Sequence, residues 1–319
     1  MSGPELVGAV VASIAQVVLV VVGAPFLTGL MRQVRARLEG RVGPGVGQPA
    51  RDLRKLVHKE ATCPEGSSVF FVAAPVVLIA TTLPLAAVIP FISTVLPIPG
   101  ADDLFAVVAV LMLGTVSLTL AALDTGTAFG GMGASREVTI LALAEPTILL
   151  AIFALSVRVG SSDLTDIVEG TLASPTQVLL PASLLAAVAF VVVIIAETGR
   201  LPVDNPSTHL ELTMIHEAMA LEYSGRDLAM VELASAMRLT ILLGLGVNLF
   251  LPWGVATSIG VAPMLLGIGA VVVKVAVAAA LLAAFEVFVA KLRIFRVPEL
   301  LAGSFLFALL AVSASFFLR

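Results

Sequence analysis

The sequence predicts an all-α polytopic membrane protein with about eight transmembrane helices in a single domain, residues 1–319. Of its residues, 59% are hydrophobic and only 13% are charged, whereas a soluble protein of this length needs more charge to cover its surface. The mean hydropathy is +1.10. Apolar segments near the ~20 residues that a span requires recur along the chain, and the shorter alternating segments of a β-barrel do not.

Eight apolar segments follow one another. They are Leu6–Leu30, Val69–Phe91, Leu104–Leu123, Val138–Val157, Val178–Ala196, Ala236–Trp253, Ala262–Ala290 and Glu299–Leu318. Loops rich in Lys and Arg stay in the cytoplasm, and here nearly all such loop residues follow odd-numbered segments. The sequence therefore predicts large cytoplasmic loops 1, 3 and 5, with both termini outside.

The first loop is strongly basic. Its Gly43–Gly47 run contains Gly-Pro-Gly and cannot continue a helix, whereas Ala50–Glu60 can form a short amphipathic helix. Such a helix lies at the membrane surface. It is either a basic membrane anchor or part of a functional surface, and the pattern leaves both interpretations open.

The third loop, Asp124–Glu137, reads DTGTAFGGMGASRE. Its glycines resemble a phosphate cradle, but the Gly-Lys-Ser/Thr ending of a P-loop is missing. We expect a tight, mobile loop that lines a cavity.

Two predicted spans carry ionisable side chains. Glu145 lies ~12 Å beyond Glu137 along a helix, and Lys274 is near the middle of the seventh span. Such groups are costly in a membrane and usually mark an ion or proton path. The alternative for Glu145 is a protonated carboxyl bonded to a neighbouring helix. Glu286, near the end of the same span as Lys274, is expected either to reach the interface near Lys291 or to have a functional role.

The fifth loop, Ala196–Leu233, concentrates the charge of the chain. Its prolines predict an irregular first part. Thr208 and Glu211 fit a capping box that starts a helix at about His209, so Glu211 has both a capping and a functional interpretation.

No metal site is predicted. His209 and His216 are ~10.5 Å apart along a helix, and His216-Glu217 does not belong to an H-E-x-x-H motif. The single cysteine, Cys63, excludes an internal disulfide and an iron–sulfur cluster that cysteines of this chain alone would hold.

Several carboxylates fall in or near the predicted cytoplasmic half. Together they could form an acidic, hydrated route toward the membrane centre: Asp124, Glu137, Glu145, Glu197 and Asp204.

Four motifs together resemble the complex I subunit 1 family, which includes membrane subunits of nickel–iron hydrogenases such as formate hydrogenlyase and hydrogenase-4. They are GRVGPGVGQPARDLRKLVHKE (40–60), FGGMGASRE (129–137), AETGRLPVDNP (196–206) and LEYSG (221–225). The wording DNPSTHLELTMIHE and the ending KLRIFRVP are similar to the hydrogenase-associated branch. Ser207 and His209 stand where the complex I pattern has carboxylates, which argues against quinone reduction.

The resemblance implies a membrane anchor that docks an iron–sulfur small subunit and a large catalytic subunit, packs on antiporter-like subunits, and helps to move protons or Na⁺. The chain itself would bind no cofactor, its partners would carry iron–sulfur clusters and nickel–iron, and quinone remains possible. Matching positions imply a proton path and a docking surface. The path comprises Glu145, Glu197 and Asp204, with Glu137 and Asp124 near its mouth. We add Lys274 to the path because it lies within a predicted span. The docking and cavity residues are Arg41, Arg51, Arg200, His209, Glu211 and Glu222.

Three other functions stay open. One is the quinone-binding subunit of NADH:quinone oxidoreductase, and another is a purely structural anchor. The third is a stand-alone transporter, for which no internal repeat is visible.

Overall fold

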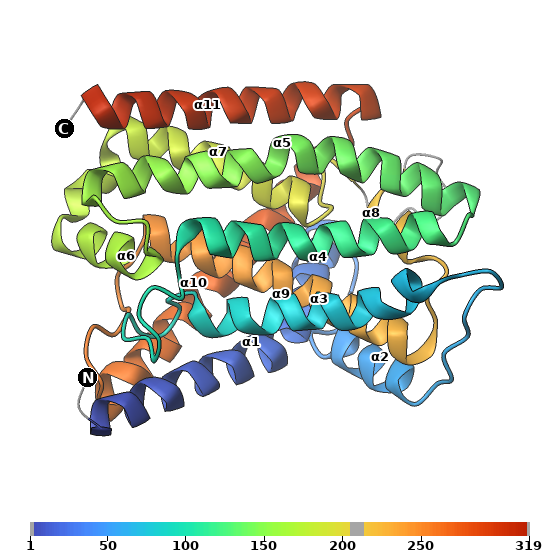
Figure 1. The fold of residues 1–319 in the computed structure, drawn as a ribbon, viewed down its shortest axis with the longest axis horizontal. Helices are drawn as coiled ribbons and strands as arrows, with labels where there is room; N and C mark the ends of the chain where they lie inside the picture. Colours follow the sequence, from blue (N-terminus) through green and yellow to red (C-terminus); the bar gives the residue numbers. More distant parts are fainter. Residues whose placement is uncertain (1–2, 205–213, 318–319) are drawn as a thin grey trace.

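The computed structural model describes residues 3–204 and 214–317, and these form a helical bundle (Figure 1). The long helices are α1 (Gly3–Leu38), α3 (Val69–Val88), α4 (Leu104–Asp124), α5 (Ala128–Val159), α7 (Pro181–Glu197), α9 (Gly225–Phe250), α10 (Val261–Phe288) and α11 (Val297–Phe317). The short ones are α2 (Gln48–Val57), α6 (Leu164–Ala173), α8 (His216–Ala220), and the 3₁₀ helices η1 (Pro175–Leu179) and η2 (Ile294–Arg296).

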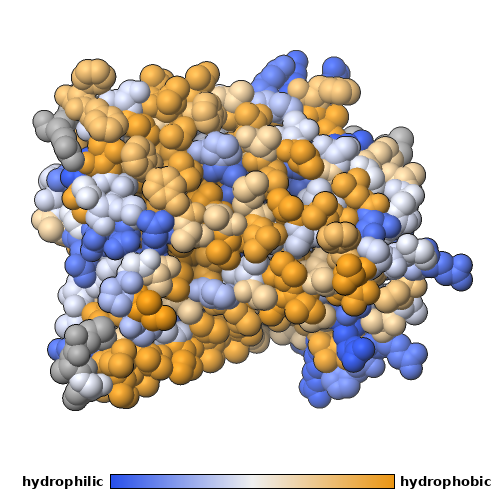
Figure 2. Space-filling model, in the orientation of Figure 1, coloured by the Kyte–Doolittle hydropathy of each residue, from blue (hydrophilic) through white to orange (hydrophobic). Residues whose placement is uncertain are grey.

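The predicted fold class is confirmed. Among the described residues, seven helices are long and apolar enough to cross a membrane, and α7 is a shorter apolar helix at the fifth predicted position. An apolar band covers the middle of the visible face, and hydrophilic side chains gather at both ends (Figure 2). This is the surface expected of a bundle in lipid.

The two ends of the bundle differ. α1 starts and α11 ends at the same end, which we call the terminus end (Figure 1). The opposite end, which we call the loop end, carries α2 and α8 and the turn between α4 and α5. α9 packs against α1, α3 and α10, and it is the most buried of the candidate spans.

The third loop was predicted wrongly. Only Thr125–Thr127 separate α4 from α5, so the glycine-rich stretch forms the first turns of α5. Thr127 caps this helix by accepting a hydrogen bond from the Gly130 amide at 3.3 Å. Two of its glycines serve close packing: a Cβ would lie 2.6 Å from the Ala122 carbonyl oxygen at Gly130 and 2.9 Å from the Ala218 Cβ at Gly133. There is no room for a side chain where α8 crosses α5.

Other boundaries also differ, and α1 ends at Leu38, eight residues beyond the predicted Leu30. α9 begins at Gly225, eleven residues before the predicted Ala236. The predicted helix in loop one is confirmed as α2, although it ends at Val57 rather than Glu60. The capping box at Thr208 and Glu211 lies outside the described residues.

Buried polar side chains hold irregular backbone near the terminus end. Asn248 donates to the carbonyls of Pro90 (2.8 Å) and Phe91 (3.0 Å), and its own oxygen accepts from Lys274. Lys274 also donates to the carbonyls of Leu251 (3.1 Å) and Trp253 (3.0 Å), just after the end of α9. These bonds satisfy backbone that lipid could not, and a cation at a helix C-terminus also complements its dipole.

Replacing Asn248 with leucine should destabilise the fold by about 3 kcal/mol, because two carbonyls and the Lys274 ammonium lose a buried partner. Unfolding in a mixed-micelle SDS titration measures this loss. The control Ser313→Ala removes an exposed hydroxyl on α11 and should change stability by less than about 0.5 kcal/mol. Equal effects of the two substitutions would contradict the role given to Asn248.

Candidate functional site

A cavity of about 850 Å³ opens at the loop end, between α1, α3, α4 and α9. Leucine and valine side chains form much of its wall, and Thr81, Thr82 and Thr115 add hydroxyls. Arg32, Arg35 and Arg41, with the polar groups described next, also line it: Glu137, Glu197, Arg200, Asp204, His216 and Arg238. The cavity therefore joins apolar walls to a dense set of charges.

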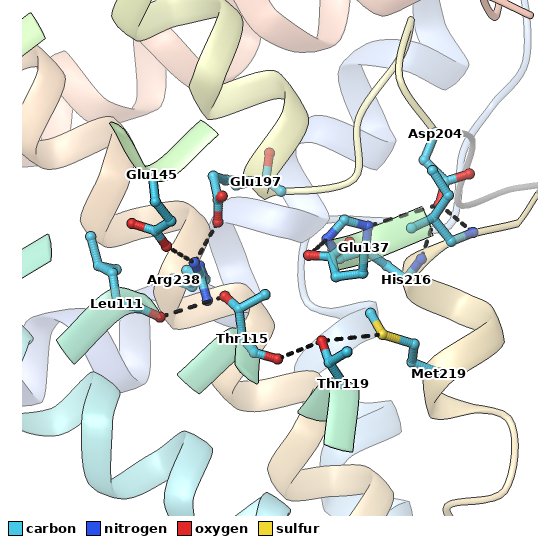
Figure 3. A network of polar contacts seen from close by, with 12 residues as sticks. Leu111, Thr115, Thr119, Glu137, Glu145, Glu197, Asp204, His216, Met219 and Arg238 are labelled. Carbon is cyan, nitrogen blue, oxygen red and sulfur yellow. Dashed lines mark hydrogen bonds and ion pairs between the residues drawn. The ribbon is translucent and has the colours of Figure 1, made fainter. Parts of the chain in front are cut away.

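The Arg238 cluster consists of Arg238, Glu197 and Glu145. The Arg238 guanidinium on α9 pairs with Glu197 at the end of α7, and its Nη2 lies 3.5 Å from Oε1 of Glu145 on α5. Both carboxylates are almost completely buried. Figure 3 shows Arg238 pointing between them. One cation thus serves two carboxylates from different helices.

The His216 cluster consists of His216, Glu137 and Asp204 (Figure 3). The His216 Nε2 lies 3.5 Å from Glu137 Oε1, and its Nδ1 lies 3.9 Å from Asp204 Oδ2. Asp204 also accepts from the backbone amides of Ile215 (3.1 Å) and His216 (3.2 Å), and from Lys291 (3.3 Å). Asp204 therefore fixes the start of α8 while it faces the imidazole.

Packing holds the imidazole in place. A Cβ on Gly199, whose φ is +58°, would lie 2.7 Å from the His216 Nδ1. Arg136 on α5 donates to the Met214 carbonyl at 2.9 Å, which ties the segment before α8 to α5. The His216 side chain keeps 28% of its surface accessible because it lines the cavity.

The Glu286 cluster consists of Glu286, Arg35 and Arg200. Glu286 on α10 is fully buried and pairs with Arg35 of α1, and its Oε1 is 3.7 Å from Nη1 of Arg200. Glu286 therefore does not reach the interface as one interpretation predicted, since it is buried between these two arginines. Burial, with nearby Arg35 and Arg32, lowers the pKa of Arg200 to about 10, so this arginine stays positive at neutral pH.

The structure brings together four of the predicted path residues: Glu137, Glu145, Glu197 and Asp204. It does not bring in Asp124, whose carboxylate accepts from the amide (2.6 Å) and hydroxyl (2.7 Å) of Ser68 at the start of α3. Nor does it bring in Lys274, whose partner Asn248 lies ten residues, or ~15 Å, along α9 from Arg238. Both residues have structural contacts at these places.

The predicted docking residues are dispersed. Arg200 lines the cavity and lies 3.7 Å from Glu286, and Arg41 lines the cavity while it pairs with Glu39. Arg51 is exposed and donates to Gln48 at 2.7 Å. Glu222 is partly buried beside Tyr223. His209 and Glu211 lie outside the described residues.

The sequence interpretation missed Arg238, Arg35 and the role of His216. Arg238 falls inside the predicted span Ala236–Trp253, and an ionisable residue in a span is a functional candidate by default. That signal could have found it. His216 was considered only as a metal ligand, and among the described residues no group of three potential ligands is placed to hold a metal.

The state of His216 should depend on pH. Burial lowers the pKa of His216, but the charges of Glu137, Asp204 and Glu197 and the contact with Asp204 raise it more, to about 9. Because the pKa is raised on folding, the stabilisation is complete below about pH 6.5 and is lost as pH rises through about 9.

Raising the pH from 7 to 10 should therefore cost about 2.5 kcal/mol of the free energy of unfolding through His216 alone. The measurement is chemical unfolding in detergent at both pH values, with His216→Gln as the reference, since glutamine does not titrate. If the wild type and His216→Gln lose stability equally, the imidazole is not held as a cation.

Known proteins have similar sequences and a similar fold. Residues 10–316 match the family described as NADH dehydrogenase. The chain is 35% identical to hydrogenase-4 component C of Escherichia coli (83% of each chain) and 32% identical to its formate hydrogenlyase subunit 4 (90% of this chain, 92% of the relative). It is also 32% identical to an NADH-quinone oxidoreductase subunit of Syntrophobacter fumaroxidans, over 72% of each chain.

A solved structure has the same fold. A chain of the membrane-bound sulfane sulfur reductase, an archaeal respiratory membrane complex, superimposes with a TM-score of 0.83 at 19% identity, over 97% of this chain and 99% of that one. The family match covers nearly the whole chain, and the alignments with the two Escherichia coli relatives cover most of the length of each relative. The chain belongs to the NADH dehydrogenase family of membrane proteins.

Proposed function

We propose that this chain is the membrane-embedded coupling subunit of a hydrogenase-type respiratory complex in a prokaryotic inner membrane. It anchors an iron–sulfur and catalytic arm on its loop end and takes part in redox-linked translocation of protons or Na⁺. The observation that carries the proposal is the set of buried carboxylates, Glu137, Glu145, Glu197 and Asp204, around a cavity open at that end. Buried carboxylates in a membrane are retained where charge must move.

The Arg238 cluster and the His216 cluster both contribute carboxylates to the cavity wall. Glu137 and Glu197 both line it, and Glu145 is reached from Glu197 through their shared contact with Arg238. Water in the cavity would connect Glu137 to Glu197, and Arg238 would adjust to the charge on either carboxylate. A proton could thus pass from Asp204 at the loop end to Glu145 inside the bundle.

The arm would dock where loop segments meet the cavity. Exposed Arg51 and the cavity-lining Arg41 make this surface basic, and Glu222 adds an acidic group. Each redox cycle of the arm would then move Asp204, which follows α7, relative to Glu137 on α5. The antiporter-like subunits would pack on an apolar side of the bundle.

The second candidate is a quinone-binding subunit of an NADH:quinone oxidoreductase. The observation that favours it is the apolar wall of the cavity, which suits a quinone ring and tail and leads to the polar groups of His216 and Asp204. The His216 ring could donate a hydrogen bond to a quinone oxygen while Asp204 orients it, and the quinone would accept electrons from the arm.

Affinity purification of the chain from its native membrane in mild detergent, followed by mass spectrometry, should recover a nickel–iron large subunit and an iron–sulfur small subunit. The sequence relatives that are 35% and 32% identical belong by name to hydrogenase-4 and formate hydrogenlyase, which is the reason for this expectation. Recovery of flavin-containing NADH dehydrogenase subunits would support the quinone-binding alternative instead.

Substituting Glu145 with glutamine in the assembled complex should lower ion translocation per turnover about tenfold or more, because an amide cannot carry the proton. Uptake into inverted membrane vesicles, measured with a pH-sensitive dye beside the redox rate, checks this. The control Glu169→Gln alters an exposed carboxylate on α6 and should have no effect. Unchanged pumping and turnover in Glu145→Gln would exclude a proton-path role for this residue.

A further inference from the structure

Asp204 and Glu137 belong to one cluster, and both face the His216 imidazole. Asp204 follows α7, whereas Glu137 lies on α5. The group between them is the His216 imidazole, with Nδ1 toward Asp204 at 3.9 Å and Nε2 toward Glu137 at 3.5 Å (Figure 3). Each ring nitrogen therefore faces a different carboxylate.

We infer that His216 is the proton-carrying link between Asp204 and Glu137. This inference rests on the proposed function and assigns one step of it to a residue that the carboxylate pattern alone does not include. Imidazole suits the task because one nitrogen accepts a proton while the other releases one, and its ordinary pKa lies near neutral pH.

The step is balanced. The ring starts as the imidazolium. Its Nε2–H bond breaks and this proton goes to Glu137, which leaves the Nδ1–H tautomer. A turn of the ring toward the cavity lets water exchange this tautomer for the Nε2–H form, and Asp204, once protonated from the loop end, then gives its proton to Nδ1. The imidazolium is restored, and one proton has moved from Asp204 to Glu137.

Both contacts are longer than the ~3.2 Å limit of a good hydrogen bond, so each transfer requires a small approach of the carboxylate to the ring. Nδ1 of His216 and Oε2 of Glu137 are buried and have no hydrogen-bond partner among the described residues, so neither atom is held in another bond. The accessible part of the ring faces the cavity, where water can reach it. The raised pKa of His216 makes the imidazolium the resting form of the ring at neutral pH, so a proton is already in place for Glu137.

Packing around the His216 ring holds it between the two carboxylates. Gly199 lies against Nδ1, and Gly133 lets α8 pack directly on α5. Asp204 binds the backbone amide of His216 at 3.2 Å, so the same carboxylate orients the residue and faces its ring. An ion pair that only stabilised the fold would need one favourable contact, whereas here both nitrogens are directed at acids.

The test uses the assembled complex in inverted membrane vesicles. Proton uptake is read as the membrane potential with a potential-sensitive dye, because neutral imidazole crosses the membrane and would collapse a pH difference. In His216→Ala, uptake per redox turnover should fall about tenfold or more, and millimolar imidazole in the buffer should restore a large part of it, because free imidazole can enter the vacated site. The control His58→Ala removes an exposed imidazole from loop one and should keep wild-type uptake, with no effect of added imidazole.

Full uptake in His216→Ala would overturn the inference, and so would a loss that imidazole does not relieve, since that loss would be structural. If His216→Ala does not assemble, His216→Gln decides: wild-type uptake overturns the inference, and a loss with normal assembly and redox rate supports it. Glu145→Gln is measured in parallel. If it loses uptake while His216→Ala retains it, the proposed function stands and only the link is wrong; if both retain it, the proposed function itself fails.

Discussion

The structure depends on compensating buried negative charge inside an apolar bundle. Glu145, Glu197 and Glu286 are nearly inaccessible, and each has an arginine partner on a different helix. An unpaired carboxylate at such a place costs several kcal/mol, so the helices that carry the partners must assemble in one register. The cation on α9, Arg238, thereby ties α5 and α7 to the centre of the bundle. Charge pairing fixes the geometry of the site and of the fold together.

Much of the fold could be predicted from the sequence. Lipid permits few backbone structures, and the length of each apolar segment can be read directly from the sequence. The positions of the long helices followed from that constraint. The start of α5 did not, because the value of Gly133 depends on contact with Ala218, which is far away in the sequence. Glycines that serve close packing and glycines that serve a mobile loop give the same composition.

The site was only partly predictable for a related reason. Glu137, Glu145, Glu197 and Asp204 could be selected because each is an acidic residue near or in a span. Their partners could not be assigned, since pairing depends on which helices are neighbours and at what height. Lys274 shows the limit clearly: as an intramembrane charge it met the same criterion as Glu145, yet its three partners are neutral oxygens near the end of α9.

The two polar regions of the bundle are separated along α9. Between Arg238 and Asn248 this helix buries apolar side chains, including Leu239, Ile241 and Leu242. The ~15 Å between the two polar residues is therefore largely apolar on α9. Glu137, Glu197 and Asp204 line the cavity, whereas the hydrogen bonds of Lys274 and Asn248 hold backbone near the terminus end. Access to the carboxylates from the loop end alone would suit the proposed coupling role, because a path open at both ends would dissipate a gradient.

The net charge of the Arg238 cluster bears on how the proposed coupling would work. One guanidinium and two carboxylates, as in Arg238, Glu197 and Glu145, carry a net charge of −1 unless a proton is bound. The contact with Glu197 is shorter than the 3.5 Å contact with Glu145, so the cation is shared unequally. Protonation of Glu197 would weaken its attraction and let Arg238 move toward Glu145, whereas protonation of Glu145 would do the opposite. The position of Arg238 and the place of the proton are therefore linked, and a change in the loop that carries Asp204 could be transmitted along α5 and α7 through charge alone.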